Sequence, residues 1–286
     1  MTVILSGENF QELCDIYIGE QEDFYYNPKI TIQIQKQLLV DNIPDNYKNP
    51  LIIFVYSHRL DKFINNLKKF KNSFILISHN SDENITEKYL SLIDNPLLVH
   101  WFAQNLLIKS NSKISLLPIG FANSIYPHGN IAIIQQNAIS VEKSNLLYFN
   151  FDVTTNKDKR EICREFVEKN GFTWIDSLPF DKYINILKQY KYSICPEGGG
   201  IDSHRIWESL SCETIPIMLK NNFSENLSKD YPCLLLDSWE DLTYELLLNN
   251  YNENPFTFEI KIKLSFDYFR KKIKDYSYTE GYLLQN

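Results

Sequence analysis

The sequence predicts an α/β protein, and three observations support that prediction. Short apolar runs typical of buried strands alternate with helical patterns, which favours parallel sheets covered by helices on both faces. The alternation begins again near residue 146, after a loop-like segment at 124–143. The 286 residues are enough for two domains of ordinary size, each with its own core. We therefore expect two Rossmann-like domains that face a cleft.

The first domain, at 1–140, contains five strand candidates. The strongest is 51–56, because its residues are mostly β-branched or aromatic and because it ends at Ser57-His58-Arg59. A second strong candidate, 74–77, is followed by His79 and Asp82. The weaker candidates are 3–5, 97–99 and 114–117, and helical patterns lie at 60–70 and 86–93.

The second domain, at 141–257, repeats this alternation. Its strand candidates are 146–149, 173–175, 192–195, 214–219 and 233–236, and its helical patterns are 160–167, 183–190, 239–248 and a short helix after Ser203. A last segment, 258–286, is basic over 258–276, where six Lys or Arg residues stand against three acids. This segment is either a solvated helix face or a basic edge that contacts a membrane surface or an anionic acceptor.

Composition limits the classes of function. A formal net charge of −7 argues against nonspecific nucleic-acid binding, which needs a basic surface. The five cysteines are odd in number and form no C-x-x-C pair, so we expect neither a disulfide framework nor a zinc site. The first residues lack the features of a signal peptide, and no apolar run is long enough to span a bilayer. We therefore expect a cytoplasmic protein, with peripheral membrane contact through the basic segment as an option.

The most informative stretch is 192–219, which predicts a buried strand, a loop, a short helix and a second strand. Three of the nine glycines stand together in the loop, at Gly198, Gly199 and Gly200. Such a loop lets main-chain N–H groups turn towards a ligand and come close to it. Asp202 and Ser203 follow, and both are good N-cap residues for the helix.

The polar side of this helix predicts an anion site. At about 100° per residue, His204, Arg205 and Glu208 share one side, whereas the opposite side is apolar and can dock on a sheet. A helix N-terminus already favours anions. Glu208 would repel phosphate but accept hydrogen bonds from sugar hydroxyls. The pattern fits a nucleotide diphosphate with its ribose, and the simpler alternative is an ordinary capped helix with an (i, i+4) pair.

Residues 195–210 read CPEGGGIDSHRIWESL, and residues 215–217 read IPI. Together they resemble the donor-site signature of exostosin-like glycosyltransferases of the GT-B fold. The resemblance is specific over 192–219 and becomes a general two-domain layout elsewhere. It implies that the glycine loop, with His204 and Arg205, holds the donor diphosphate, and it allows a C-terminal helix at 258–286 that crosses back to the first domain. Glu197 departs from the pattern, because the family often has a basic residue there.

Two further residues of the second domain and two of the first complete the candidate set. Asn156 and Arg160 follow the strand at 146–149, and Arg160 is either another cation for the leaving diphosphate or a surface charge. His79 and Asp82 are candidates for the catalytic base that deprotonates an acceptor hydroxyl, and His58 occupies the same place after the preceding strand. A loop histidine that only satisfies backbone groups is an equal alternative.

The chain contains no Asp-x-Asp motif, which agrees with charge neutralisation by side chains and a helix dipole. We therefore expect no metal and no cofactor besides a nucleotide-diphosphate sugar as donor. The resemblance implies an inverting glycosyltransferase that acts on a glycan, lipid-linked or protein acceptor in surface polysaccharide or glycan assembly. The alternatives are a non-catalytic nucleotide or nucleotide-sugar binding module, and a nucleotide-sugar epimerase or phosphorylase.

Overall fold

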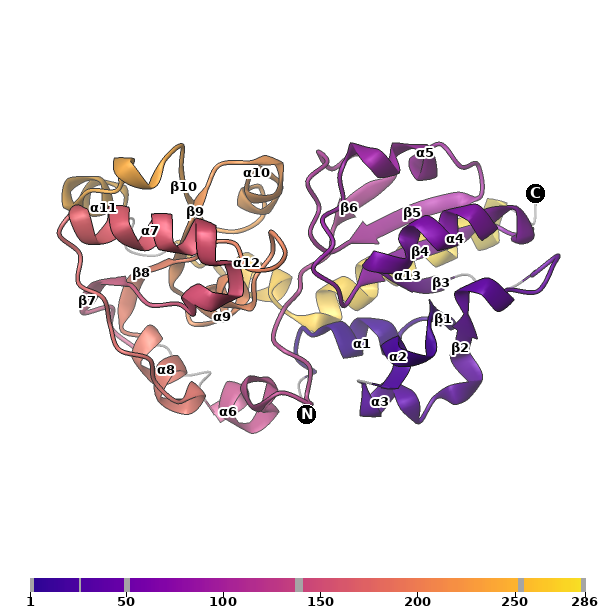
Figure 1. Cartoon of the computed structure of the whole chain (residues 1–286), viewed down its shortest axis with the longest axis horizontal. Helices are drawn as coiled ribbons and strands as arrows, with labels where there is room; N and C mark the ends of the chain where they lie inside the picture. Colours follow the sequence, from indigo (N-terminus) through magenta and orange to yellow (C-terminus); the bar gives the residue numbers. More distant parts are fainter. Residues whose placement is uncertain (1–2, 26, 49–51, 137–140, 252–254, 284–286) are drawn as a thin grey trace. The chain divides into compact units, whose positions relative to one another are not determined.

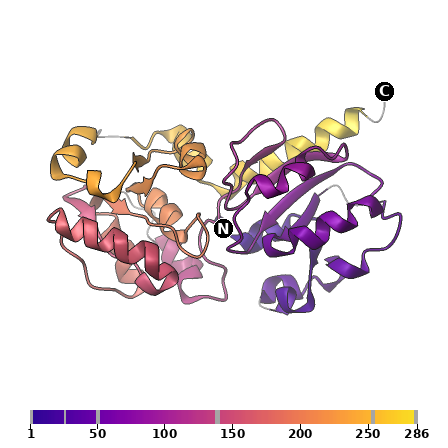
Figure 2. The same ribbon diagram turned by 45° about the horizontal axis from the view of Figure 1, so that its top comes forward.

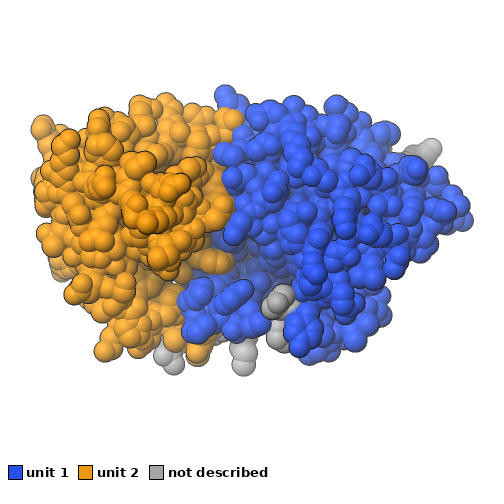
Figure 3. All heavy atoms as spheres, in the orientation of Figure 1, with its two compact units in different colours: residues 1, 3–129, 265–286 blue, residues 2, 130–264 orange. Residues whose placement is uncertain are grey.

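The computed structural model describes residues 3–25, 27–48, 52–136, 141–251 and 255–283. The chain divides into two compact units (Figure 3). The first unit contains Val3–Gly129 and Ser265–Asn286, and the second contains Asn130–Leu264. The boundaries thus lie after residues 129 and 264, whereas the sequence suggested 140 and 257. The segment before 264 belongs to the second unit, and its Lys261 pairs with Glu213 of that unit at 2.7 Å.

The first unit is built on a parallel sheet of six strands in the order β2-β1-β3-β4-β5-β6. The strands are β1 (Ile16–Gly19), β2 (Gln37–Leu39), β3 (Ile52–Tyr56), β4 (Phe74–His79), β5 (Leu98–Ala103) and β6 (Ile114–Leu116). Because β1 pairs with β2 on one side and with β3 on the other, the strand order reverses between β1 and β3. Ligands of open α/β sheets bind outside the carboxyl ends of the strands at such a switch point.

Helices cover both faces of this sheet, with α4 and α13 on opposite faces (Figure 1). Alternate strand residues such as Ile53 and Val55 pack with Phe63 of α4, while Phe10 of α1 meets Phe266 and Phe269 of α13 on the other face. The helices are α1 (Gly7–Glu12), α2 (Gln21–Tyr25), α3 (Pro28–Thr31), α4 (Leu60–Asn66), α5 (Leu90–Ile93) and α13 (Phe266–Leu283), with 3₁₀ turns η1 (Ile34–Lys36), η2 (Val40–Asn42), η3 (Ser57–Arg59), η4 (Leu67–Lys69), η5 (Glu87–Tyr89) and η6 (Pro127–Gly129).

The second unit is built on a parallel sheet of four strands in the order β10-β9-β8-β7. These are β7 (Asn145–Tyr148), β8 (Tyr190–Ile194), β9 (Ile215–Leu219) and β10 (Leu234–Leu236). The helices are α6 (Ile131–Gln136), α7 (Lys157–Lys169), α8 (Phe180–Leu187), α9 (His204–Ser211), α10 (Asn222–Ser228), α11 (Tyr244–Asn250) and α12 (Phe258–Lys263), with η7 (Val153–Asn156) and η8 (Trp239–Asp241). Figure 2 shows these elements, coloured from pink to orange, in a second view.

The α/β class and the two parallel sheets confirm the general part of the prediction, whereas the GT-B arrangement of two domains that face a cleft stays a prediction. Two of the strand predictions are wrong. Residues 3–5 form no strand, and the neighbouring Ser6 makes isolated bridges to Gly120 and Phe121. Residues 173–175 are irregular, although Ile175 donates its main-chain N–H to the Phe149 carbonyl at 2.9 Å. The sequence also missed β1 and β2, which are only four and three residues long. None of the helices in the described residues combines the length and apolar character needed to cross a membrane.

Candidate functional site

The glycine loop of the second unit follows β8, a central strand with a neighbour on each side. The ladder continues past the strand, because Cys195 donates its N–H to the Ile217 carbonyl at 3.0 Å. Residues 196–203 then leave the sheet at its carboxyl end, and α9 begins at His204. The structure therefore puts this loop where open α/β sheets bind ligands.

Two predicted residues hold the loop in place from the region after β7. The Asn156 amide donates to the Gly198 carbonyl at 2.8 Å. Arg160 is only 7% exposed and donates to the carbonyls of Glu197 at 2.9 Å and Asp152 at 2.5 Å. A Cβ added at Gly198 would lie 3.3 Å from Arg160 Nη2, so the close approach favours glycine there. Arg160 is thus not a surface charge, since carbonyl oxygens accept from its Nε and Nη1, and its expected contact with the leaving diphosphate stays a prediction.

The start of α9 differs from the capped helix that the sequence predicted. Ser203 is the N-cap by backbone conformation, but its side chain makes no capping hydrogen bond. The buried Ser203 hydroxyl has no hydrogen-bond partner. Asp202 instead accepts a hydrogen bond from the Trp207 indole at 2.8 Å, so it ties the loop to the apolar side of the helix. The helix start consequently keeps a buried hydroxyl donor that the protein itself does not use.

Arg205 lies against two aromatic rings that the sequence analysis did not identify. Its guanidinium carbon is 4.8 Å from the Tyr183 ring centroid and 5.7 Å from the Tyr148 ring centroid, which are cation–π distances. Burial opposes its charge, but the Tyr183 phenol and the Glu208 carboxylate outweigh burial and raise the pKa of Arg205. Its Nη1 atom is buried and has no hydrogen-bond partner. No sequence signal marks Tyr148 or Tyr183, because both are far from Arg205 along the chain.

Glu208 and His204 occupy different environments on α9. Glu208 is 5% exposed, and its Oε2 accepts the Tyr183 hydroxyl at 2.9 Å. It therefore lies inside the unit and supports Tyr183, and its expected contact with ribose stays a prediction. His204 is the first residue of the helix and is half-buried. Glu197 pairs with Lys159, so its carboxylate is compensated rather than directed at a phosphate.

Histidine His79 of the first unit lies in the protein interior at the end of β4. It is 1% exposed, its Nε2 lies 2.9 Å from the Pro118 carbonyl oxygen, and its Nδ1 accepts the main-chain N–H of Asn80 at 2.8 Å. A Cβ at Gly7 would lie 2.7 Å from that Nδ1, so α1 closes over the ring. This is the alternative in which the histidine satisfies backbone groups, and its nitrogens do not face solvent.

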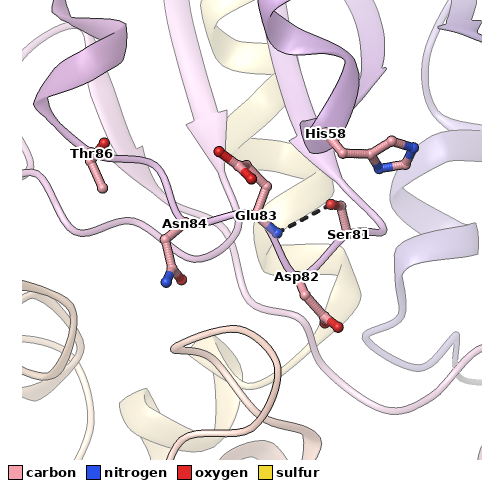
Figure 4. A pocket seen from close by; sticks show the side chains of 6 residues that line it. All are labelled: His58, Ser81, Asp82, Glu83, Asn84 and Thr86. Carbon is pink, nitrogen blue, oxygen red and sulfur yellow. Dashed lines mark hydrogen bonds between the residues drawn. The ribbon is translucent and has the colours of Figure 1, made fainter.

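Asp82, by contrast, is exposed and lines a hollow in the first unit. The hollow has a volume of about 520 Å³ and is lined by His58, Ser81, Asp82, Glu83, Asn84 and Thr86. Asp82 and Asn84 project to one side of the loop that follows β4, and Glu83 projects to the other (Figure 4). A buried network fixes the start of this loop, because Asn80 donates to Gln11 at 3.2 Å and Gln11 donates to the Tyr56 hydroxyl at 2.8 Å.

Two other segments of the first unit have structural roles. In the 100–105 segment, the Trp101 indole donates to the buried Ser78 hydroxyl at 2.8 Å, so this segment belongs to the core of the sheet. Gly120 has φ +67 and bridges to Ser6, so its loop has a structural role. All five cysteines are free thiols, and Cys233 is the most exposed of them. Within the described ranges, no three His, Cys, Asp or Glu side chains are grouped so that they could hold a metal ion.

Comparisons with known proteins add no further assignment. No model of a protein family matches the chain, and no curated protein sequence is significantly similar to it.

Proposed function

We propose that the chain is a glycosyltransferase that uses a nucleotide-diphosphate sugar, and that the start of α9 binds the donor diphosphate. The observation behind this proposal is the pair of unused donors there, the Ser203 hydroxyl and Arg205 Nη1. An unsatisfied buried donor costs about 1–3 kcal/mol, and more if it is charged. A diphosphate would satisfy both groups and would also meet the N–H groups and dipole of the helix start.

The chemistry follows from the same groups. Negative charge develops on the diphosphate as its bond to the sugar breaks, and preorganised donors stabilise that charge by about 2–4 kcal/mol per group. Arg205 keeps its positive charge beside Tyr183 and Glu208, so it can supply such stabilisation without a metal ion. We propose an inverting, metal-independent displacement by an acceptor hydroxyl of a glycan or lipid-linked sugar.

Ligand binding gives the first test. Purified protein is heated with a panel of nucleoside diphosphates and their sugars, with EDTA present. A ligand at 100 times its dissociation constant stabilises the native state by about 2.7 kcal/mol and raises Tm. Arg205→Gln should abolish that rise. Arg164→Gln is the matched control, because Arg164 is 43% exposed and pairs with Glu168 away from the loop. No stabilisation of the wild-type protein by any member of the panel would refute the proposal.

A binding module without catalysis is the second candidate, and the burial of His79 favours it. That histidine was one of the two expected bases, and both of its nitrogens are used inside the protein. The two candidates differ in their products. A module would show the Tm increase but release no nucleoside diphosphate, whereas a transferase would release it with a new glycosidic bond. An epimerase or a phosphorylase would convert the same donor into other products.

A further inference from the structure

The switch point of the first sheet carries a histidine–carboxylate pair. Asp23 lies on α2, which follows β1, and His58 lies on η3, which follows β3. Their side chains meet across the point where the strand order reverses, with 2.8 Å between His58 Nε2 and Asp23 Oδ1. The segments that carry the pair approach each other closely at Gly19, where an added Cβ would lie 2.8 Å from the Tyr56 ring and 3.0 Å from Asp23 Oδ2.

The surroundings of Asp23 fix the proton of His58. Asp23 Oδ2 accepts the Glu20 N–H at 2.7 Å and Arg59 Nε at 2.8 Å, and Oδ1 accepts Arg59 Nη2 at 3.2 Å. Burial would raise the pKa of Asp23, but hydrogen bonds from His58 and Arg59 outweigh it and lower that pKa to about 2. An ionised carboxylate only accepts hydrogen bonds, so neutral His58 carries its proton on Nε2. Nδ1 is left with a lone pair.

His58 also borders the hollow that Asp82 lines. Its side chain is 39% exposed, whereas that of Asp23 is 6% exposed. The other lining residues bear hydroxyl, amide or carboxylate groups, namely Ser81, Asp82, Glu83, Asn84 and Thr86 (Figure 4). These groups suit a ligand with many hydroxyls, because each lining group can form a hydrogen bond with a ligand hydroxyl as donor or acceptor. The acceptor class that matches this lining is a sugar.

We propose that the hollow binds a sugar acceptor and that His58 is its catalytic base, with Asp23 as the positioning residue. This inference rests on the proposed function. The acceptor hydroxyl transfers its proton to His58 Nδ1, and its oxygen forms a bond to the anomeric carbon of the donor. The bond from that carbon to the diphosphate breaks, and its electron pair leaves with the nucleoside diphosphate. The Asp23 carboxylate stabilises the imidazolium, which later releases its proton to water.

A single substitution at Asp23 tests the role of the carboxylate. In Asp23→Asn, the amide oxygen stays at the Oδ2 position, because Glu20 and Arg59 donate there. The amide NH₂ then faces His58 Nε2, which must become the acceptor and shift its proton to Nδ1. His58 Nδ1 then has no lone pair for catalysis, while an uncharged hydrogen bond joins the introduced amide to His58 Nε2. A purely structural pair would tolerate this change without an effect on turnover.

The experiment combines kinetics with a spectroscopic readout of the tautomer. The donor selected by the Tm panel is incubated with a panel of methyl glycosides. His58→Gln and Asp23→Asn should each lower kcat by about 100-fold or more, with the KM for donor within about twofold. Long-range ¹⁵N–¹H spectra should show the Nε2–H form of His58 in the wild-type protein and the Nδ1–H form in Asp23→Asn. His128→Gln, in the same unit but outside the hollow, should leave kcat unchanged.

The outcomes separate the inference from the proposed function. Wild-type kcat in His58→Gln, or an unchanged tautomer with full turnover in Asp23→Asn, would overturn the assignment of the base and leave the transferase intact. Loss of donor binding in His58→Gln would also overturn it, because His58 would then act on the donor or the fold. Failure of every nucleotide sugar to bind the wild-type protein would remove the proposed function together with this inference.

Discussion

The buried histidine His100 should make the first unit sensitive to mild acid. It is 1% exposed on β5, and its ring stacks on Tyr276 of α13 with 4.1 Å between centroids. Nδ1 lies 3.1 Å from the Ser112 carbonyl oxygen and Nε2 lies 2.9 Å from the Ser115 hydroxyl, so the neutral ring donates once and accepts once. Burial lowers the pKa of His100 to about 4, against the opposing effect of the Ser112 carbonyl and with help from the positive Lys272.

The sign and size of the effect follow from this shift. The unfolded chain binds a proton near pH 6.5 and the folded chain only near 4, so the contribution of His100 to stability is complete above pH 6.5. It falls as the pH drops towards 4. At about 1.36 kcal/mol per pKa unit, the free energy of unfolding should fall by about 2 kcal/mol at pH 5 and by about 3 kcal/mol in total.

Two measurements check this prediction. An NMR titration of the His100 ring gives its pKa directly in the folded protein. Native-state hydrogen exchange of the β5 amides, corrected for the intrinsic pH dependence of exchange, gives the stability of the first unit between pH 8 and pH 5. His100→Gln removes the titrating group, so its stability should vary less with pH even if it starts lower. A ring that titrates above pH 6 in the folded state, or equal pH dependence in the two proteins, would refute the reasoning.

Two further substitutions test the backbone and the loop. Gly120→Ala should destabilise the first unit by about 2 kcal/mol or more, because φ is +67 and the new Cβ would lie 2.5 Å from the Leu5 carbonyl oxygen. The control Gly171→Ala has φ +87 but its nearest atom is 3.9 Å away, so it should cost only about 1 kcal/mol. Urea unfolding measures both losses. Arg160→Gln should lower the free energy of unfolding of the second unit by about 3 kcal/mol and speed hydrogen exchange in 196–200, because it leaves buried carbonyls unpaired. The control Lys159→Gln, at a position that is 62% exposed, should lower it by about 0.5 kcal/mol or less. Equal losses within either pair of variants would contradict the respective argument.

The strands β3 and β4 were predicted because they are apolar on both faces. β3 and β4 are completely buried, since helices cover both sides of the sheet, and a buried parallel strand produces a continuous apolar run. β2 is half-buried along its length at the edge of the sheet, and its three residues give no such run. Residues 173–175 were wrongly predicted as a strand. Their apolar Trp174 packs on the rings of Phe149 and Phe151, and the segment does not join a strand ladder.

The candidate site was predictable in position but not in detail. Parallel strands made it possible to expect that loops after β7 and β8 meet, as Asn156 and Gly198 do. The helical period also gave the apolar side of α9 correctly. It could not show that Tyr183 of α8 would take up one oxygen of Glu208, because that contact depends on how two helices pack. The pairing of Asp23 with His58 could not be predicted for a different reason, because β1, the strand before α2, was not predicted.

Two arginines near the loop of the second unit show why the proposed anion site is more than a helix start. Burial lowers the pKa of Arg160, and the positive charge of Arg205 lowers it further, so the two guanidinium groups repel each other. The carbonyl oxygens of Glu197 and Asp152 accept hydrogen bonds from Arg160 and so stabilise its buried charge. Arg205 has aromatic faces beside it but leaves Nη1 without an acceptor. Glu208 stabilises the positive charge of Arg205, but Nη1 still lacks an acceptor, and under the proposed function the oxygens of a diphosphate would supply one.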